Sequence, residues 1–260
     1  MLNQFFIIQD NQLQKSCWGY CASCRKEHSL AEGLARQHCL ELMKTLDEKK
    51  RIDLALPDKE ANPRYSTEYL YGKARGQMFG VMVYRKPDGF ISALKAFSGQ
   101  YDGVWEVKGW APPLFDVHAF NTISHDVEKR IKQLGRQIDK LDVASPDKKK
   151  LTRQRKNLSQ HLMKDIHSLY RLTNFQGETR SLYDVFTGAN GIPTGTGDCC
   201  APKLLNFAAK NDLRPLGLAE FYWGRENRLG SRMHGRFYPS CEGKCQPILG
   251  FLLCGLESYE

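Results

Sequence analysis

Two cysteine pairs near the C-terminal end of the 260-residue sequence are the residues best suited to chemistry. Cys199 and Cys200 form the first pair, and Cys241 and Cys245 form the second. Each pair stands where an apolar helical pattern begins, so the sulfur atoms would lie at helix N-termini. Backbone N–H groups and the helix dipole favour thiolate at that position, and thiolate is the form that binds metal. The spacing therefore predicts a metal site built from two helix starts.

The elements that would position these thiols follow a simple order. Asp198 is a good N-cap and Pro202 is tolerated in a first turn, which predicts a helix ending near Lys210. Residues 216–223 form an apolar run typical of a buried strand, and residues 246–253 predict a second helix. This helix, strand, helix order resembles the zinc-dependent nucleoside and nucleic-acid deaminases, in which a His or Cys opens one helix and a Cys pair opens the next.

The resemblance implies a defined chemistry. Three protein ligands leave one zinc position for a water whose pKa falls towards about 7, and the hydroxide attacks a cytosine or adenine ring carbon. The sequence departs from the deaminase pattern in two ways. Its second pair has three intervening residues rather than two, and the Glu expected two residues after the first ligand is missing. A general acid or base would then come from Glu220, Asp198 or Glu242.

A closed structural zinc site is the alternative at the same place. It would use Cys199 or Cys200 together with His234, Cys241 and Cys245. Four protein ligands would leave no position for water, so such a site would only stabilise the fold. The sequence does not choose between Cys199 and Cys200.

The net charge and the cysteine content of the chain indicate the kind of binding partner and the cellular compartment to expect. The net charge of +9 favours an anionic partner, and nucleic acid fits best. Nine cysteines in short groups favour metal ligation in a reducing compartment over a disulfide framework. No secretory signal and no apolar run long enough for a bilayer is present, so we expect no membrane partner and a cytoplasmic location.

A second metal site is expected near the N-terminus. Cys21, Cys24, His28 and Cys39 offer four ligands, the last two on or near a helix that begins around Ser29. This set is typical of a closed structural zinc site. Buried free cysteines in a helical layer are the alternative.

The remaining pattern predicts an α/β fold with a deaminase-like three-layer core. A strand at residues 77–84, a turn at residues 86–89 and a strand at residues 90–97 predict a β-hairpin. Leucine and isoleucine stripes within residues 124–170 predict an inserted helical hairpin. The expected organisation is an N-terminal metal-binding helical segment at 1–60, a deaminase-like domain at 70–123 and 171–260, and the inserted hairpin at 124–170.

Basic residues gather in two segments. The inserted hairpin has twelve Lys and Arg against six Asp and Glu, which gives +6 of the net +9. Such an arm could follow a phosphate backbone, or it could be a solvated brace. The candidate RNA-binding residues are Lys148, Lys149, Lys150 and Arg153 in the hairpin, and Arg225, Arg228, Arg232 and Arg236 after the strand.

Longer motifs support a resemblance at family level. These are Gly76-Gln-Met-Phe-Gly-Val, Ala96-Phe-Ser-Gly, Pro112-Pro-Leu-Phe-Asp, Gly197-Asp-Cys-Cys-Ala-Pro-Lys-Leu-Leu, Ala219-Glu-Phe-Tyr-Trp-Gly and Tyr238-Pro-Ser-Cys-Glu-Gly-Lys-Cys-Gln-Pro-Ile-Leu. Over nearly its whole length the chain resembles the N-terminal region fused to RluA-type bacterial pseudouridine synthases. The synthases' catalytic-Asp motif is not in the sequence.

The resemblance implies a function. A cytidine deaminase makes the uridine that a pseudouridine synthase needs, so the chain would edit C to U in RNA, with the tRNA anticodon arm as substrate and a synthase as partner. The first alternative is a non-catalytic, zinc-stabilised RNA-binding module that presents tRNA to a synthase. The second is a structural or partner-binding protein without an RNA role.

Overall fold

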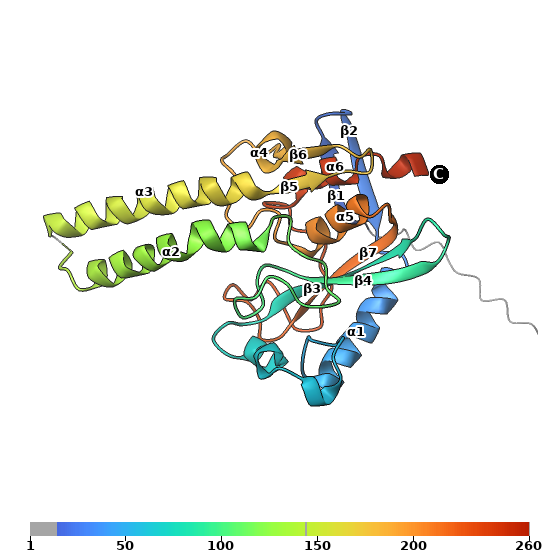
Figure 1. Cartoon of the computed structure of the whole chain (residues 1–260), viewed down its shortest axis with the longest axis horizontal. Coiled ribbons are helices and arrows are strands. Elements are labelled where there is room, and N and C mark those ends of the chain that lie inside the picture. The colour runs from blue at the N-terminus through green and yellow to red at the C-terminus, as the bar shows by residue number, and fades with distance from the viewer. Residues whose placement is uncertain (1–14, 144, 260) are drawn as a thin grey trace, which may run out of the picture.

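The computed structural model of the chain describes residues 15–143 and 145–259, which form a mixed α/β fold with small antiparallel sheets (Figure 1). The strands are β1 (Lys15–Cys21), β2 (Lys26–Ala31), β3 (Gln77–Arg85), β4 (Ile91–Phe97), β5 (Arg171–Thr173), β6 (Thr179–Ser181) and β7 (Arg214–Trp223). The helices are α1 (Ala35–Lys49), α2 (Val117–Asp139), α3 (Pro146–Leu169), α4 (Leu182–Val185), α5 (Cys200–Lys210) and α6 (Gln246–Leu253). Short 3-10 helices cover Asp58–Glu60, Pro63–Tyr65, Thr67–Tyr71 and Leu256–Tyr259.

The central sheet has the order β4-β3-β7, and both pairings are antiparallel. Since successive side chains of a strand point to opposite faces, β3 serves two cores. Phe79 and Val81 pack beneath α1, whereas Met82 packs beneath α5. The sheet therefore lies between α1 on one face and α5 on the other.

The β-hairpin, the strand and the two helices predicted around the C-terminal cysteine pairs are confirmed. The predicted β-hairpin forms β3 and β4, the predicted strand forms β7, and the two predicted helices form α5 and α6. Helix α5 begins at Cys200, with Cys199 rather than the predicted Asp198 as its N-cap. The expected domain boundaries at 60, 123 and 170 stay predictions.

The N-terminal segment differs from the expectation of a purely helical segment. It starts with the β1–β2 hairpin, and α1 begins only at Ala35. Strand β1 packs directly on α6, because a Cβ atom at Gly19 would lie only 2.5 Å from the backbone N of Gly250. Two glycines thus allow a strand and a helix from opposite ends of the described chain to touch backbone to backbone.

Helices α2 and α3 form the predicted helical hairpin, which we call the arm. They run side by side and project from the body of the molecule (Figure 1). Leu134 and Ile138 of α2 and Leu162 and Ile166 of α3 are buried in the arm. The helix α2 begins earlier than predicted because Asp116 caps it, accepting a 2.7 Å hydrogen bond from the backbone N of Ala119.

Candidate metal centres

Three cysteines from distant parts of the sequence meet in what we call the three-cysteine centre. Cys199 and Cys245 are the N-cap residues of α5 and α6, and Cys241 lies in the turn before α6. Their sulfur atoms all lie within 4.8 Å of one another, and the Cys199 and Cys241 sulfurs are 3.9 Å apart. Two thiolates on a tetrahedral zinc ion stand about 3.8 Å apart, given Zn–S bonds of about 2.3 Å. The spacing therefore suits a metal ion.

One negative charge is already favoured at this centre. Hydrogen bonds from the thiols of Cys199 and Cys245 lower the pKa of Cys241 far below its usual range. The same interaction with Cys241 raises the pKa of Cys199. The neighbouring thiols thus favour the thiolate form of Cys241, and thiolate is the form that binds metal.

Two of the predicted ligands, Cys200 and His234, lie outside the three-cysteine centre. The Cys200 thiol is buried and points to the backbone oxygens of Met78, at 3.4 Å, and Ala96, at 3.6 Å. The Nδ1 atom of His234 accepts a 3.0 Å hydrogen bond from the backbone N of Gly224, and its ring lies against Trp223. Of the first cysteine pair, it is Cys199 that faces the centre. Within the described part of the chain, no fourth Cys, His, Asp or Glu joins the group.

Glu220 of β7 lies at the start of α5. Its carboxylate accepts a 2.8 Å hydrogen bond from Ser240 and another from the backbone N–H of Ala201. The side chain is buried, and burial raises its pKa to about 7. Gly80 on the neighbouring strand β3 makes room for the Cys200 and Glu220 side chains. A Cβ atom at Gly80 would lie 2.8 Å from Cys200 Cβ and 3.2 Å from Glu220 Cγ. Glu220 is thus hydrogen-bonded to the neighbours of Cys241 and Cys200, whereas Glu242 is exposed.

Asp198 joins the arm to the centre. The hydroxyl of Tyr170, the C-cap residue of α3, donates a 2.6 Å hydrogen bond to its Oδ1. Burial raises the pKa of Asp198. The Oδ1 atom of Asp198 is therefore engaged by Tyr170, which ties the end of α3 to the turn before Cys199, and a catalytic role of Asp198 stays a prediction.

Lys203 is a buried charge that the sequence analysis missed. Its Nζ donates hydrogen bonds of 2.9 Å to the Phe97 oxygen and 2.8 Å to the Gly99 oxygen. Burial lowers its pKa to about 8. The residue ties α5 to the end of β4. Its position in the first turn of an apolar helix is the only sequence signal for this role.

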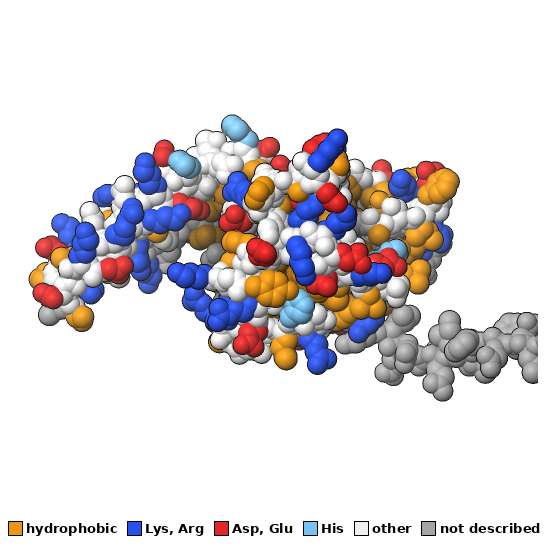
Figure 2. All heavy atoms as spheres, turned by 90° about the horizontal axis from the view of Figure 1, so that it is seen from below, with side chains coloured by type: hydrophobic (Ala, Val, Ile, Leu, Met, Phe, Trp, Pro, Cys, Tyr) orange, Lys and Arg blue, Asp and Glu red, His pale blue; other side chains and the backbone are white. Residues whose placement is uncertain are grey.

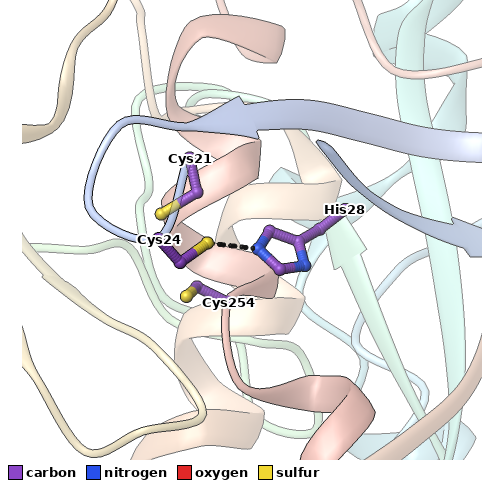
Figure 3. A group of neighbouring side chains, drawn as sticks. All are labelled: Cys21, Cys24, His28 and Cys254. Atoms are coloured by element: carbon purple, nitrogen blue, oxygen red, sulfur yellow. Dashed lines mark hydrogen bonds between the residues drawn. The ribbon is translucent and has the colours of Figure 1, made fainter. Parts of the chain in front are cut away.

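A second group, which we call the four-ligand cluster, contains Cys21, Cys24, His28 and Cys254 (Figure 3). Their ligand atoms lie within 4.8 Å of one another, and Cys24 Sγ is 3.0 Å from His28 Nε2. The backbone turns tightly here, since Arg25 has a φ of 61° and donates its N–H to the Cys21 oxygen at 2.8 Å. Three of these residues are those expected from the sequence.

Cys39, the fourth ligand expected from the sequence, lies outside this cluster. It lies on the buried face of α1, and its thiol donates a 3.3 Å hydrogen bond to the backbone oxygen of Ala219. Cys254, the C-cap residue of α6, occupies the place assigned to it. Cys254 rather than Cys39 joins the cluster because β1 lies against α6. The helix α1, which carries Cys39, lies on the far side of the sheet from α5.

The candidate RNA-binding residues fall on two separate surfaces. Lys149, Lys150 and Arg153 are exposed in the first turns of α3, at the free end of the arm. Lys148 donates its Nζ to the Leu141 oxygen at 2.9 Å and so helps to close the arm. Figure 2 shows Lys and Arg side chains along the arm and on part of the body.

The arginines after β7 lie in a loop. They are Arg225, Arg228, Arg232 and Arg236. The Arg232 guanidinium stands 4.1 Å from the ring centre of Tyr238, and Arg236 lines a hollow of about 360 Å³ with Lys15, Arg36 and Tyr238. This surface presents cations beside aromatic rings.

None of the helices in the described residues has the length and apolar character needed to cross a membrane.

Comparison with known proteins identifies no relative of the chain. No protein-family model matches the chain, and no curated protein or solved structure is significantly similar to it.

Proposed function

We propose that the chain is a zinc-dependent hydrolytic cytidine deaminase that acts on RNA, with tRNA as its substrate and a pseudouridine synthase as its partner. The single observation that carries this proposal is the three-cysteine centre. It gathers three thiols without a fourth protein ligand in the described residues, and the buried carboxyl group of Glu220 is hydrogen-bonded to Ser240, the residue before Cys241. Three protein ligands with one open position are typical of catalytic rather than structural zinc.

The donor set fits zinc. Thiolate is a preferred ligand of this ion, and Cys199, Cys241 and Cys245 are the residues that would hold it. Zinc in such a site supplies an activated water as a nucleophile at neutral pH. The order of elements also supports a deaminase-like fold, because the β3–β4 hairpin precedes α5, β7 and α6.

Glu220 is the residue we assign to proton transfer. In zinc deaminases a Glu that is not a ligand acts as general acid and base. Here Glu220 would accept a proton from water at its carboxylate and pass it to N3 of cytosine. Cytidine and water then give uridine and ammonia. Ser240 and the Ala201 N–H would hold the carboxylate in place.

RNA as the substrate follows from charge. The chain carries a net +9, and the exposed Lys149, Lys150 and Arg153 stand at the end of the arm. Phosphate contacts of this kind give affinity that decreases as salt increases. A splayed anticodon loop would present an extruded cytidine at low cost, and the uridine produced is the substrate that a pseudouridine synthase requires.

The second candidate is a non-catalytic, zinc-stabilised module that presents tRNA to a synthase. One observation favours it: Glu220 is only 3% exposed and already accepts two hydrogen bonds. In that case the three-cysteine centre would bind zinc, and the chain would still bind tRNA. The cytidines of the tRNA would remain unchanged.

The test incubates the zinc-loaded chain with cellular tRNA and with tRNA transcripts, with and without an RluA-type synthase. Sequencing should detect C-to-U changes that are absent with Glu220→Gln. Unchanged cytidine in every combination, with tRNA still bound, would favour the second candidate over ours. Negligible tRNA binding even at low salt would remove both.

A second test measures the contribution of the basic residues at the end of the arm to tRNA affinity. Replacing Lys149, Lys150 and Arg153 by Gln should weaken tRNA binding and reduce the slope of log K against log salt by up to about 2 to 3, since each phosphate contact adds about 0.7 to 0.9. The matched control replaces the exposed Lys44, Lys59 and Lys86 by Gln, which removes the same charge from other surfaces. Equal losses in both variants would show that only net charge matters.

A further inference from the structure

The four-ligand cluster has the composition of a closed metal site. Three thiols and one imidazole are a common donor set of structural zinc, in which protein ligands fill all four positions. Cys24 Sγ lies 3.0 Å from His28 Nε2, and all four ligand atoms lie within 4.8 Å of one another. Figure 3 shows the four side chains directed toward one another from the hairpin and from the end of α6. No position would remain for water, so this site differs in kind from the three-cysteine centre.

His28 has a buried nitrogen that calls for a partner. Its Nδ1 is buried and makes no hydrogen bond, and the nearest charged group is the Glu257 carboxylate at 3.5 Å. Histidine ligands of metals usually donate their second ring N–H to a carboxylate or a carbonyl. With Nε2 directed at the thiols and Nδ1 directed at Glu257, His28 already has the orientation of a ligand.

The two halves of the cluster come together through close backbone packing. A Cβ atom at Gly19 would stand 2.5 Å from the backbone N of Gly250, and a methyl group at Gly250 would overlap the Tyr20 carbonyl. This contact between β1 and α6 brings Cys21, at the end of β1, next to Cys254. The cluster therefore lies where the two elements meet.

The helix α6 carries one residue of each cysteine group. Cys245 is its N-cap and Cys254 its C-cap. The helix has eight residues, about 12 Å in length, and is too short to be stable alone in water. Fixing its C-terminal end would thus also restrain Cys245 at its other end.

We propose that Cys21, Cys24, His28 and Cys254 bind a structural zinc ion that fastens the N-terminal hairpin to the C-terminal end of α6. Glu257 is a positioning residue that holds His28 through Nδ1. The inference does not rest on deaminase activity, because its ligands and its test are separate from those of the three-cysteine centre.

Zinc content tests the proposal. The folded variant Cys254→Ser should hold one zinc ion per chain fewer than the wild type, whereas Cys39→Ala should match the wild type. Hydrogen exchange in Cys254→Ser should increase in residues 15–31 and 246–254 and stay unchanged in the arm. An unchanged zinc content in Cys254→Ser, or a lost ion in Cys39→Ala, would overturn the proposal. Absence of deaminase activity would not change the zinc content expected for these two variants, so the two proposals can fail separately.

A measurement on the wild-type chain covers the case in which Cys254→Ser does not fold. After exchange of zinc for cadmium-113, cadmium–proton correlation spectra should connect one ion to the β protons of Cys21, Cys24 and Cys254 and to the His28 ring. Correlation with Cys39 in place of Cys254, or the absence of any ion bound to His28, would contradict the assignment. Glu257→Gln should weaken zinc retention against a chelator by about 10-fold or more, and Glu257→Asp should restore part of it.

Discussion

Ser240 donates a 2.8 Å hydrogen bond to the carboxylate of Glu220, which joins β7 to the segment that leads into Cys241. Nearly all of this carboxylate is shielded from water. Two backbone contacts reinforce the junction, because Tyr238 donates its N–H to the Glu220 oxygen and Ser240 donates its own to the Ser16 oxygen. The Glu220 carboxylate is thus held at a fixed place against the segment that leads into Cys241.

Glu220→Gln should keep zinc and lose activity. Glutamine preserves the shape and can still accept from Ser240, but it cannot take up a proton at neutral pH. We expect C-to-U conversion to decrease by about 10²-fold to 10⁴-fold, with zinc content and tRNA affinity unchanged. Single-turnover assays and metal analysis on one preparation check this. Loss of zinc together with loss of folding would instead indicate a purely structural role.

Cys199→Ser and Cys200→Ala should separate the two neighbouring cysteines. Cys199→Ser removes a sulfur of the three-cysteine centre, so the chain should lose one zinc ion and its activity. Cys200→Ala removes a buried thiol outside the centre and should keep both, at a cost of about 1 kcal/mol in stability. Metal analysis and urea unfolding check the pair. Zinc loss in Cys200→Ala alone would reverse the assignment.

Gly250→Ala should destabilise the junction between hairpin and helix. The added methyl group would overlap the Tyr20 carbonyl, and neither backbone can move without shifting the four-ligand cluster. We expect a loss of about 2 kcal/mol or more in the free energy of unfolding, together with weaker zinc retention. Gly191→Ala is the matched control, because a Cβ atom there meets nothing within 4 Å. Equal stability of the two variants would contradict the packing argument.

Lys203 should make stability depend on pH. Burial lowers its pKa to about 8, whereas the unfolded chain has the ordinary lysine value of about 10.4. Between these values the unfolded state binds more protons, so this residue makes the fold more stable as pH rises. Relative to Lys203→Met, the wild type should gain about 2 kcal/mol between pH 7 and pH 9.5. Urea unfolding at both pH values checks this, and a constant difference would contradict it.

Local signals in the sequence were enough to predict the elements around the three-cysteine centre. The turn at Lys86-Pro-Asp-Gly89 marks the β3–β4 hairpin, and helical stripes mark the arm. The cysteine pairs stand at helix starts, which is where the structure has them. Each of these signals depends on residues close together in the chain.

The rest depended on tertiary packing. The choice of Cys199 over Cys200 is set by the phase of one helical turn, which spacing does not reveal. His234 lies in a loop without periodicity, so nothing in the sequence placed it against Trp223. Cys254 looks like one more apolar residue at the end of an apolar helix, and only the contact between Gly19 and Gly250 brings it to Cys21. The deaminase activity, the RNA substrate and the synthase partner stay predictions.

The separation of Cys21, Cys24 and His28 from Cys254 along the sequence fixes an order of events during synthesis. A ribosome releases the first three donors early and the last one only after almost all of the remaining described chain has emerged. Any ion captured by the nascent hairpin would be incompletely coordinated, and therefore exchangeable, until Cys254 has emerged. If these four residues bind zinc as proposed, full coordination would begin only when α6 docks, so the metal available at that stage of folding would decide which cation the site keeps.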